Sequence, residues 1–225
     1  MTFVLGVAVF LAIYNNLANV VGIPEWLYVP ANLALACALV AAGRAQGFRW
    51  DTMGLARTGV VPGLRWGLAG GVVVAFGLAV AVAWPPAAPF LADERVAGLS
   101  VGALAFRVLV RIPLGTAVLE EVAFRGVLFG AWAQARSVRA AVTGSSAVFG
   151  LWHIGPTIVL LAENEVTLGA GGLVLAVTGS VAATTVAGVV FCGLRLRSGG
   201  IVAPALVHVA TNSLGTLAAF WAQRV

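Results

Sequence analysis

Three groups of polar side chains interrupt a chain that is otherwise strongly apolar. They are Glu120, Glu121 and Arg125 in VLEEVAFRGVLFG, His153 in FGLWH, and His208 and Asn212 in HVATN. The chain has no other histidine. A charged side chain at the centre of a bilayer costs at least about 2.5 to 3.5 kcal/mol on insertion scales, so these residues mark a candidate functional site.

A carboxylate, two imidazoles and an amide are together sufficient to hydrolyse a peptide bond. A glutamate helped by a histidine can hold and deprotonate a water molecule. A second histidine and an asparagine amide can donate hydrogen bonds to the oxyanion that develops. Glutamate and histidine are also ordinary zinc ligands, so a zinc site built from Glu120, His153 and His208 is a second interpretation. The absence of HExxH favours a glutamate-bound water without an obligatory metal.

Residue spacing predicts which of these side chains act together. Glu121 and Arg125 are four residues apart, so they can form an ion pair on one face of a helix. Glu120 points about 100° away from Glu121 on an α-helix and is predicted to face other partners. His208 and Asn212 are also four residues apart and are predicted to face the same way. A structural ion pair and a packing histidine are the alternatives without chemistry.

The composition indicates a membrane protein. Of the 225 residues, 61% are hydrophobic and only 9% are charged, and the mean hydropathy is +1.03. A typical soluble domain has roughly 25% charged residues. We therefore expect residues 1–225 to form a single membrane domain. Every basic residue is an arginine and the arginines are scattered, which argues against a nucleic-acid partner.

Seven apolar segments approach the length of about 20 residues that a spanning helix needs. They are Thr2–Val21, Leu27–Ala42, Trp66–Trp84, Ile112–Ala133, Ala140–Ala162, Leu168–Leu194 and Ile201–Ala222. The sequence thus predicts an all-α, polytopic transmembrane bundle of about seven spans. The second segment is short, and Leu99–Val110 is either an interfacial piece or the start of one long, kinked helix. Only the fourth segment contains Asp, Glu, Lys or Arg.

The charges of the loops predict the topology. Arginines follow the second, fourth and sixth spans, whereas carboxylates gather in the opposite loops. By the positive-inside rule the N-terminus is cytoplasmic and the C-terminus is outside, in an integral protein that we expect in the plasma membrane. The segment from Gly47 to Gly63 has an amphipathic pattern and is predicted to lie on the cytoplasmic surface.

Depth in the membrane supports a shared site. Counted from the cytoplasmic end of each span at 1.5 Å per residue, Glu120 and His153 lie about 20 Å deep and His208 about 14 Å deep. All three side chains are therefore predicted to meet in one cavity.

The order of the motifs resembles the CAAX-protease and bacteriocin-processing (CPBP, or Abi) family of intramembrane endopeptidases, relatives of the type II CAAX prenyl proteases. The family pattern is EExxxR, then FxxxH, then HxxxN, matched here by Glu120, Glu121, Arg125, Phe149, His153, His208 and Asn212. RSGGIVAPALVH, which leads into the last motif, is also similar to the family. The resemblance covers about residues 114–214 and marks this region as a CPBP-like catalytic core.

The resemblance implies a protease that cleaves a membrane-associated peptide or protein substrate. By the resemblance, Glu120 activates water together with His153. His208 and Asn212 then form the oxyanion site, and Glu121 and Arg125 support the arrangement. Members are often called metalloproteases. The substrate class stays open between a prenylated C-terminal peptide and a small peptide precursor.

Two other functions fit some of the same residues. A proton-coupled transporter also keeps carboxylates and histidines inside the membrane, but the chain lacks the internal repeat of broken helices that is typical of transporters. A non-catalytic immunity or scaffold protein, which binds a partner within the lipid bilayer, is the third interpretation.

Overall fold

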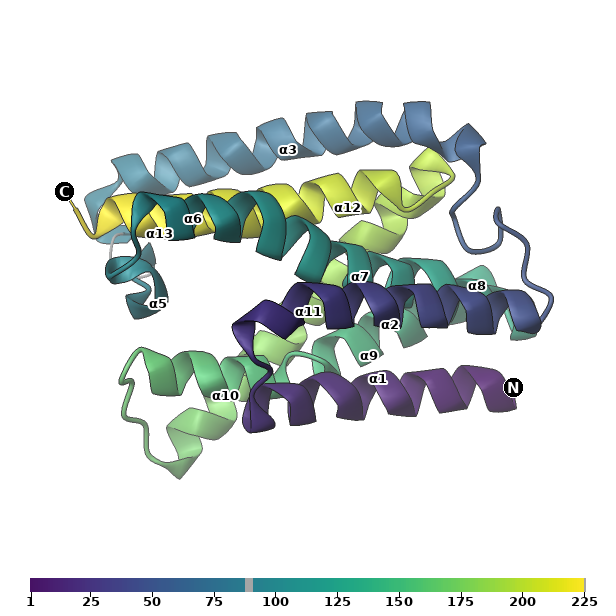
Figure 1. Cartoon of the computed structure of the whole chain (residues 1–225), viewed down its shortest axis with the longest axis horizontal. Coiled ribbons are helices and arrows are strands. Elements are labelled where there is room, and N and C mark those ends of the chain that lie inside the picture. The colour runs from purple at the N-terminus through teal and green to yellow at the C-terminus, as the bar shows by residue number, and fades with distance from the viewer. Residues whose placement is uncertain (88–90, 225) are drawn as a thin grey trace.

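The computed structural model describes residues 1–87 and 91–224, and these residues form helices joined by short loops, with no strand (Figure 1). Seven helical segments are long and apolar enough to cross a membrane. This confirms the predicted all-α, polytopic bundle and makes the chain an integral membrane protein.

Four of the seven spans are single helices or nearly so, and three are broken or change their winding. The first span is α1 (Thr2–Val21) and the second is α2 (Glu25–Ala45). The third consists of η1 (Arg57–Gly59), which α3 (Val60–Ala83) continues. The short η2 (Pro85–Ala87) and α5 (Glu94–Ala97) precede the fourth span. The sixth span is α11 (Ala170–Ser198). The second span has 21 residues, so it is longer than the sequence predicted.

The fourth span is one helix of 35 residues, Val101–Ala135, whose winding changes along its length. Its parts are α6 (Val101–Phe106), η3 (Arg107–Ala117), α7 (Val118–Glu120), η4 (Glu121–Leu128) and α8 (Phe129–Ala135). Of the two interpretations of Leu99–Val110, the start of one long helix therefore holds from Val101 onward. Both η3 and η4 are π-helical, and η3 contains Pro113, which has no N–H to donate. Such π-turns are frequent at functional sites.

The fifth span breaks at Trp152 and His153, between α9 (Val138–Leu151) and α10 (Ile154–Glu163). Two amides of α1 bind the backbone at this break. Asn15 donates to the Trp152 carbonyl at 2.9 Å, and Asn16 donates to the Leu151 carbonyl at 3.0 Å and accepts from Gly155 N–H at 2.6 Å. Because the membrane offers few other partners for free backbone groups, these amides stabilise the break.

The seventh span consists of α12 (Val202–Val209), the π-helical η5 (Ala210–Leu214) and α13 (Gly215–Ala222). It runs beside α3, as Figure 1 shows. A Cβ atom on Gly63 would lie 2.6 Å from Val202, and one on Gly67 would lie 2.7 Å from Leu206. Small residues thus allow these two backbones to approach closely, as in many membrane helix pairs.

The segment between α2 and α3 covers one end of the bundle. The sequence predicted an amphipathic piece on the cytoplasmic surface of the membrane, and in the structure two of its apolar side chains pack into the protein. Met53 is completely buried, and Phe48 is buried with its ring edge-on to Phe3. The segment packs into the bundle because its apolar side chains find contacts with protein at the ends of the helices.

Candidate active site

The Glu120 carboxylate is buried near the middle of the fourth span. Its Oε1 accepts a hydrogen bond from the Trp152 indole N–H at 3.1 Å. Its Oε2 lies 3.7 Å from His208 Nε2 and has no hydrogen-bond partner among the described residues. One oxygen of Glu120 is therefore held in place while the other is left for a further donor.

Glu121 lies at the centre of a second buried cluster. Its Oε1 is 3.1 Å from Arg125 Nη1 and 2.8 Å from His208 Nδ1. The ion pair between Glu121 and Arg125 has the predicted i, i+4 spacing. The bond to His208 joins the fourth and seventh spans. Because an ionised carboxylate only accepts hydrogen bonds, His208 Nδ1 is the donor.

Aromatic rings enclose this cluster. The Arg125 guanidinium lies 4.0 Å from the ring centroid of Phe149 and 4.8 Å from that of Phe191. The His208 ring stacks on Phe191 with centroids 5.3 Å apart. A guanidinium over ring faces is a favourable arrangement in a dry interior, and it fixes Arg125 against the family-pattern residue Phe149.

His153 lies at the break of the fifth span, and its orientation suggests which ring nitrogen is free. Its Nδ1 is 2.7 Å from the Phe149 carbonyl oxygen. Since a carbonyl only accepts, Nδ1 carries the hydrogen and Nε2 is an acceptor in the neutral ring. His153 therefore offers a basic nitrogen to any group that comes within reach.

Glu120, His153 and Asn212 line one cavity of about 600 Å³. Asn212 comes from the π-helical η5, and its side-chain amide makes no hydrogen bond to any described residue, while Thr216 binds its backbone carbonyl. His208 is one turn away and is buried between the two glutamates. Three of the four predicted catalytic side chains therefore line one cavity. The fourth, His208, lies next to Glu120 and is not part of the lining.

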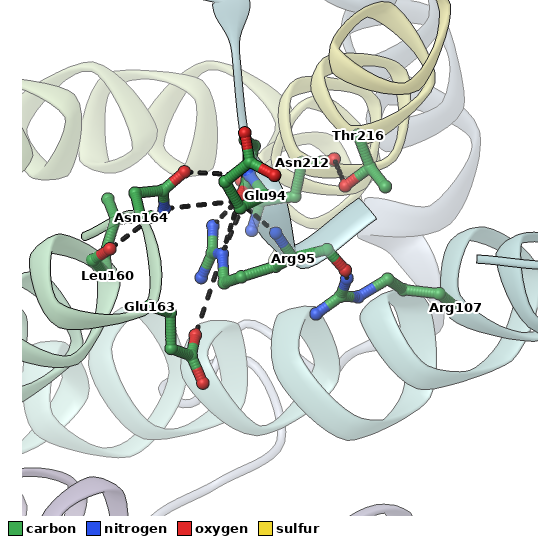
Figure 2. Close-up of polar contacts among 9 residues, drawn as sticks. Glu94, Arg95, Arg107, Leu160, Glu163, Asn164, Asn212 and Thr216 are labelled. Atoms are coloured by element: carbon green, nitrogen blue, oxygen red, sulfur yellow. Dashed lines mark hydrogen bonds and ion pairs between the residues drawn. The ribbon is translucent and has the colours of Figure 1, made fainter. Parts of the chain in front are cut away.

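Charged residues also line this cavity, and Figure 2 shows polar contacts made by several of them. Arg95 lies between Asp93, at 2.8 Å, and Glu163, at 3.9 Å. Arg107 donates to the Arg95 carbonyl at 2.8 Å. Burial favours the neutral acid at Asp93, but the hydrogen bonds and charge of Arg95 outweigh it and hold the pKa of Asp93 below its usual value.

The chain is similar to one known protein family. A family model described as type II CAAX prenyl endopeptidase Rce1-like matches residues 102–214, just over half of the 225 residues. The chain belongs to this family. No curated protein and no solved structure matches the chain.

Membership in the Rce1-like family confirms the resemblance inferred from the motifs and identifies the chain as an intramembrane protease of the CAAX type. The matched region contains every residue of the three motifs. It excludes α1, whose amides hold the break at Trp152 and His153, and α2, which packs against the fourth span. In this Rce1-like chain, elements outside the family region therefore shape the site.

The proposed zinc ligands do not converge. Within residues 1–87 and 91–224, no three His, Cys, Asp or Glu side chains lie close enough together to hold a metal ion. His208 binds Glu121 through Nδ1 and His153 binds a backbone carbonyl through Nδ1, so only Nε2 of each ring is free. Glu120, His153 and His208 do not form a group that could hold a metal ion among these residues.

Trp152 is a site residue that the motifs did not reveal. It is adjacent to His153 and almost completely buried, and it donates to Glu120 across 32 positions of the sequence. A buried indole N–H needs an acceptor, so a tryptophan beside an intramembrane histidine was the signal available in the sequence.

We expect Trp152→Phe to lower kcat by about 10- to 100-fold with little change in KM, because a hydrogen bond to a charged group contributes about 1.5 to 3 kcal/mol. Phenylalanine keeps most of the ring but loses the N–H. Steady-state kinetics measures the effect, with the exposed Trp26→Phe as the matched control. An unchanged kcat in a folded Trp152→Phe protein would show that the indole only packs.

Proposed function

We propose that this protein is an intramembrane endopeptidase that hydrolyses a peptide bond in or near the membrane with a water activated by Glu120. The observation that carries the proposal is the presence of Glu120, His153 and Asn212 in the wall of one cavity. The substrate is a membrane-associated peptide or protein. A buried carboxylate next to a basic imidazole is a suitable pair for general-base catalysis.

In the proposed mechanism the water lies between Glu120 and His153. The indole of Trp152 holds Glu120 Oε1, and His153 presents Nε2 because Nδ1 is used on the backbone. Glu120 removes a proton from the water as its oxygen attacks the carbonyl carbon, and the proton is then delivered to the leaving amine. Each hydrogen bond already made in the protein reduces the reorganisation needed in the transition state.

Asn212 is the proposed oxyanion donor. Its amide faces the cavity and is not used by any described protein group. The family resemblance implies that His208 shares this role. Because His208 Nδ1 binds Glu121 and His208 is not among the residues that line the cavity, we assign His208 to the support of Glu121 instead.

Glu121 and Arg125 support the site from behind. Glu121 fixes the tautomer of His208, and Arg125 compensates the buried charge of Glu121. A second group that orients a catalytic side chain is common in enzyme sites. We further propose a plasma-membrane location with the N-terminus in the cytoplasm, supported by the arginines of the loops after the second, fourth and sixth spans.

The proposal is tested with purified protein in lipid and a library of quenched membrane peptides. We expect turnover by the wild-type protein that persists after treatment with a metal chelator. Reversible loss of activity on chelation, with stoichiometric zinc in the active protein, would contradict this mechanism and show that a metal ion activates the water. Peptide-independent proton uptake by the same vesicles, with no cleavage, would favour the transporter.

We expect Asn212→Ala to fold normally, to keep its KM, and to lose about 10² to 10³ in kcat, the usual cost of removing one oxyanion donor. Kinetics on the peptide selected from the library gives both constants. Gln134→Ala, which removes an exposed amide at the other end of the bundle, is the control. A change in KM alone would make Asn212 a binding residue and remove the oxyanion assignment.

A further inference from the structure

Six hydroxyl side chains line the cavity that contains Glu120, and four of them use their hydrogen within the protein. Three of the four are Thr157, Thr211 and Thr216, which donate to the carbonyl oxygens four positions earlier at 2.6, 2.9 and 2.8 Å. Figure 2 shows the bond made by Thr216. Ser180 lies 2.7 Å from Thr157 Oγ1 and is the donor there, because the single hydrogen of Thr157 is already used. These four hydroxyls therefore have no hydrogen left for a substrate.

The two remaining hydroxyls of the lining, those of Tyr28 and Thr116, bind each other. Their oxygens are 3.0 Å apart, and neither makes another hydrogen bond within residues 1–87 and 91–224. Each hydroxyl has one hydrogen, and the bond between them uses only one of the two. The pair therefore leaves one O–H for a group that enters the cavity.

The chemistry of the two hydroxyls determines which hydrogen is left. A phenol is a stronger acid than an aliphatic alcohol, so Tyr28 is the better donor and Thr116 the better acceptor. Thr116 then keeps its own hydrogen for the cavity. Hydrogen bonds in a chain polarise one another, so a hydroxyl that accepts from Tyr28 is also a better donor. Thr116 is thus the member of the pair that can donate to a bound peptide.

Packing between α2 and η3 holds Tyr28 in this position. A Cβ atom on Gly115 would lie 2.9 Å from the Tyr28 ring, so the ring packs directly on the backbone of η3. The buried Asn32 donates to the Gly115 carbonyl at 2.8 Å, and the Arg111 guanidinium lies 3.9 Å from the centroid of the Tyr28 ring. These contacts fix the phenol beside Thr116. The family match begins at residue 102, so Tyr28 is an addition from outside the matched region.

Thr116 is placed correctly for a group that acts together with Glu120. The two residues are four positions apart on the fourth span, about one turn and about 6 Å along the helix axis, and both line the cavity. A reacting carbonyl must lie about 3 Å from the attacking water and from its oxyanion donors, so it fits between these levels. Asn212 comes from η5, which packs on η3, where Ser213 donates to the Val108 carbonyl at 2.8 Å.

We propose that Thr116 is a second oxyanion donor beside Asn212, and that Tyr28 is a positioning residue that acts through Thr116. The inference rests on the proposed function. In the reaction the Thr116 O–H donates a hydrogen bond to the oxygen of the scissile carbonyl as that oxygen becomes negative. Its hydrogen stays on Thr116 throughout. Donors from the fourth and seventh spans then stabilise the same oxyanion.

Thr116→Val tests the donor, because valine keeps the branched shape and loses the hydroxyl. We expect kcat to fall by about 10² to 10³ with KM unchanged, the usual cost of one oxyanion donor. Thr116→Ser, which keeps the O–H, is expected to retain most of the wild-type kcat. Steady-state kinetics in lipid on a peptide that the wild type cleaves gives both constants, and thermal unfolding shows that the variants are folded. The matched control is Thr143→Val, which removes an exposed hydroxyl of α9 and is expected to keep full activity.

Tyr28→Phe tests the positioning role. We expect a loss of about 2- to 10-fold in kcat, the size of one neutral hydrogen bond. In the Thr116→Val background the same change is expected to cost nothing further, because the group through which Tyr28 acts is already absent. An independent role of the phenol would give the same factor in both backgrounds and would overturn the positioning role.

A phosphinic analogue of the cleaved peptide tests the donor without turnover, because its tetrahedral centre carries an anionic oxygen in place of the scissile carbonyl. Thr116→Val is expected to weaken its binding by the same factor by which kcat falls. A folded Thr116→Val protein with unchanged kcat, or with a change in KM alone, would overturn the inference and leave the proposed function standing. A larger loss in Tyr28→Phe than in Thr116→Val would overturn the assignment of the donor to Thr116. Failure of the wild type to cleave any peptide of the library would remove the proposed function, and the role of Thr116 with it.

Discussion

Glu120→Gln is expected to reduce peptide turnover by about 10⁴-fold or to background, because the amide cannot accept the proton that a general base removes from water. The substitution is nearly isosteric, and the glutamine oxygen can still accept from the Trp152 indole. The loss therefore falls on kcat, and the protein folds. Single-turnover kinetics in lipid, together with thermal unfolding of the same sample, measures both.

The control for this change is Glu165→Gln, which removes an exposed carboxylate from the loop after α10. It is expected to keep full activity. If Glu120→Gln retains most of the wild-type rate, then Glu120 is not the base and the buried carboxylate has a structural role only.

Arg125→Ala is expected to destabilise the fold, because it leaves the buried Glu121 without its positive partner. Removing one member of a buried ion pair costs about 3 to 5 kcal/mol. Arg125 is 1% exposed and Glu121 is 0% exposed, so water does not replace the lost charge. The contacts of the guanidinium with Phe149 and Phe191 are lost as well. The measurement is the free energy of unfolding in detergent or lipid, and activity is expected to fall with the folded fraction.

The matched control is Arg139→Ala, which removes an exposed arginine from the first turn of α9 and is expected to leave stability unchanged. Arg125→Lys keeps the charge but loses the planar group that stacks on the rings, so an intermediate stability is expected. An Arg125→Ala protein that is as stable as the wild type but inactive would contradict the supporting role and place the arginine in the chemistry.

Features that depend on neighbouring residues were predictable from the sequence. The seven spans follow from runs of apolar residues, because a helix in lipid must be apolar over the full thickness of the bilayer. The pair between Glu121 and Arg125 follows from a spacing of four residues, which places both side chains on one helix face even in the π-helical η4. The order of the three motifs was sufficient to indicate the family that the comparison then confirmed.

Rotation about the helix axes was not predictable, because depth along a span does not determine which way a side chain faces. The prediction that His208 and Asn212 act as one pair assumed regular α-helical winding, whereas η5 is π-helical between them. As a result Asn212 reaches the cavity while His208 binds Glu121, which is 87 positions away in the sequence.

Contacts between distant spans decided the rest of the site. The Trp152 indole meets Glu120 at a break in the fifth span, and Asn15 and Asn16 of α1, more than 130 positions away in the sequence, bind the backbone of that break. Met53 is likewise buried by residues of helices that are distant from it in the sequence. The sequence by itself determined which residues are too polar for lipid. The tertiary structure decided which of them meet, because each buried polar group must take its hydrogen-bond partners from whichever helices pack beside it.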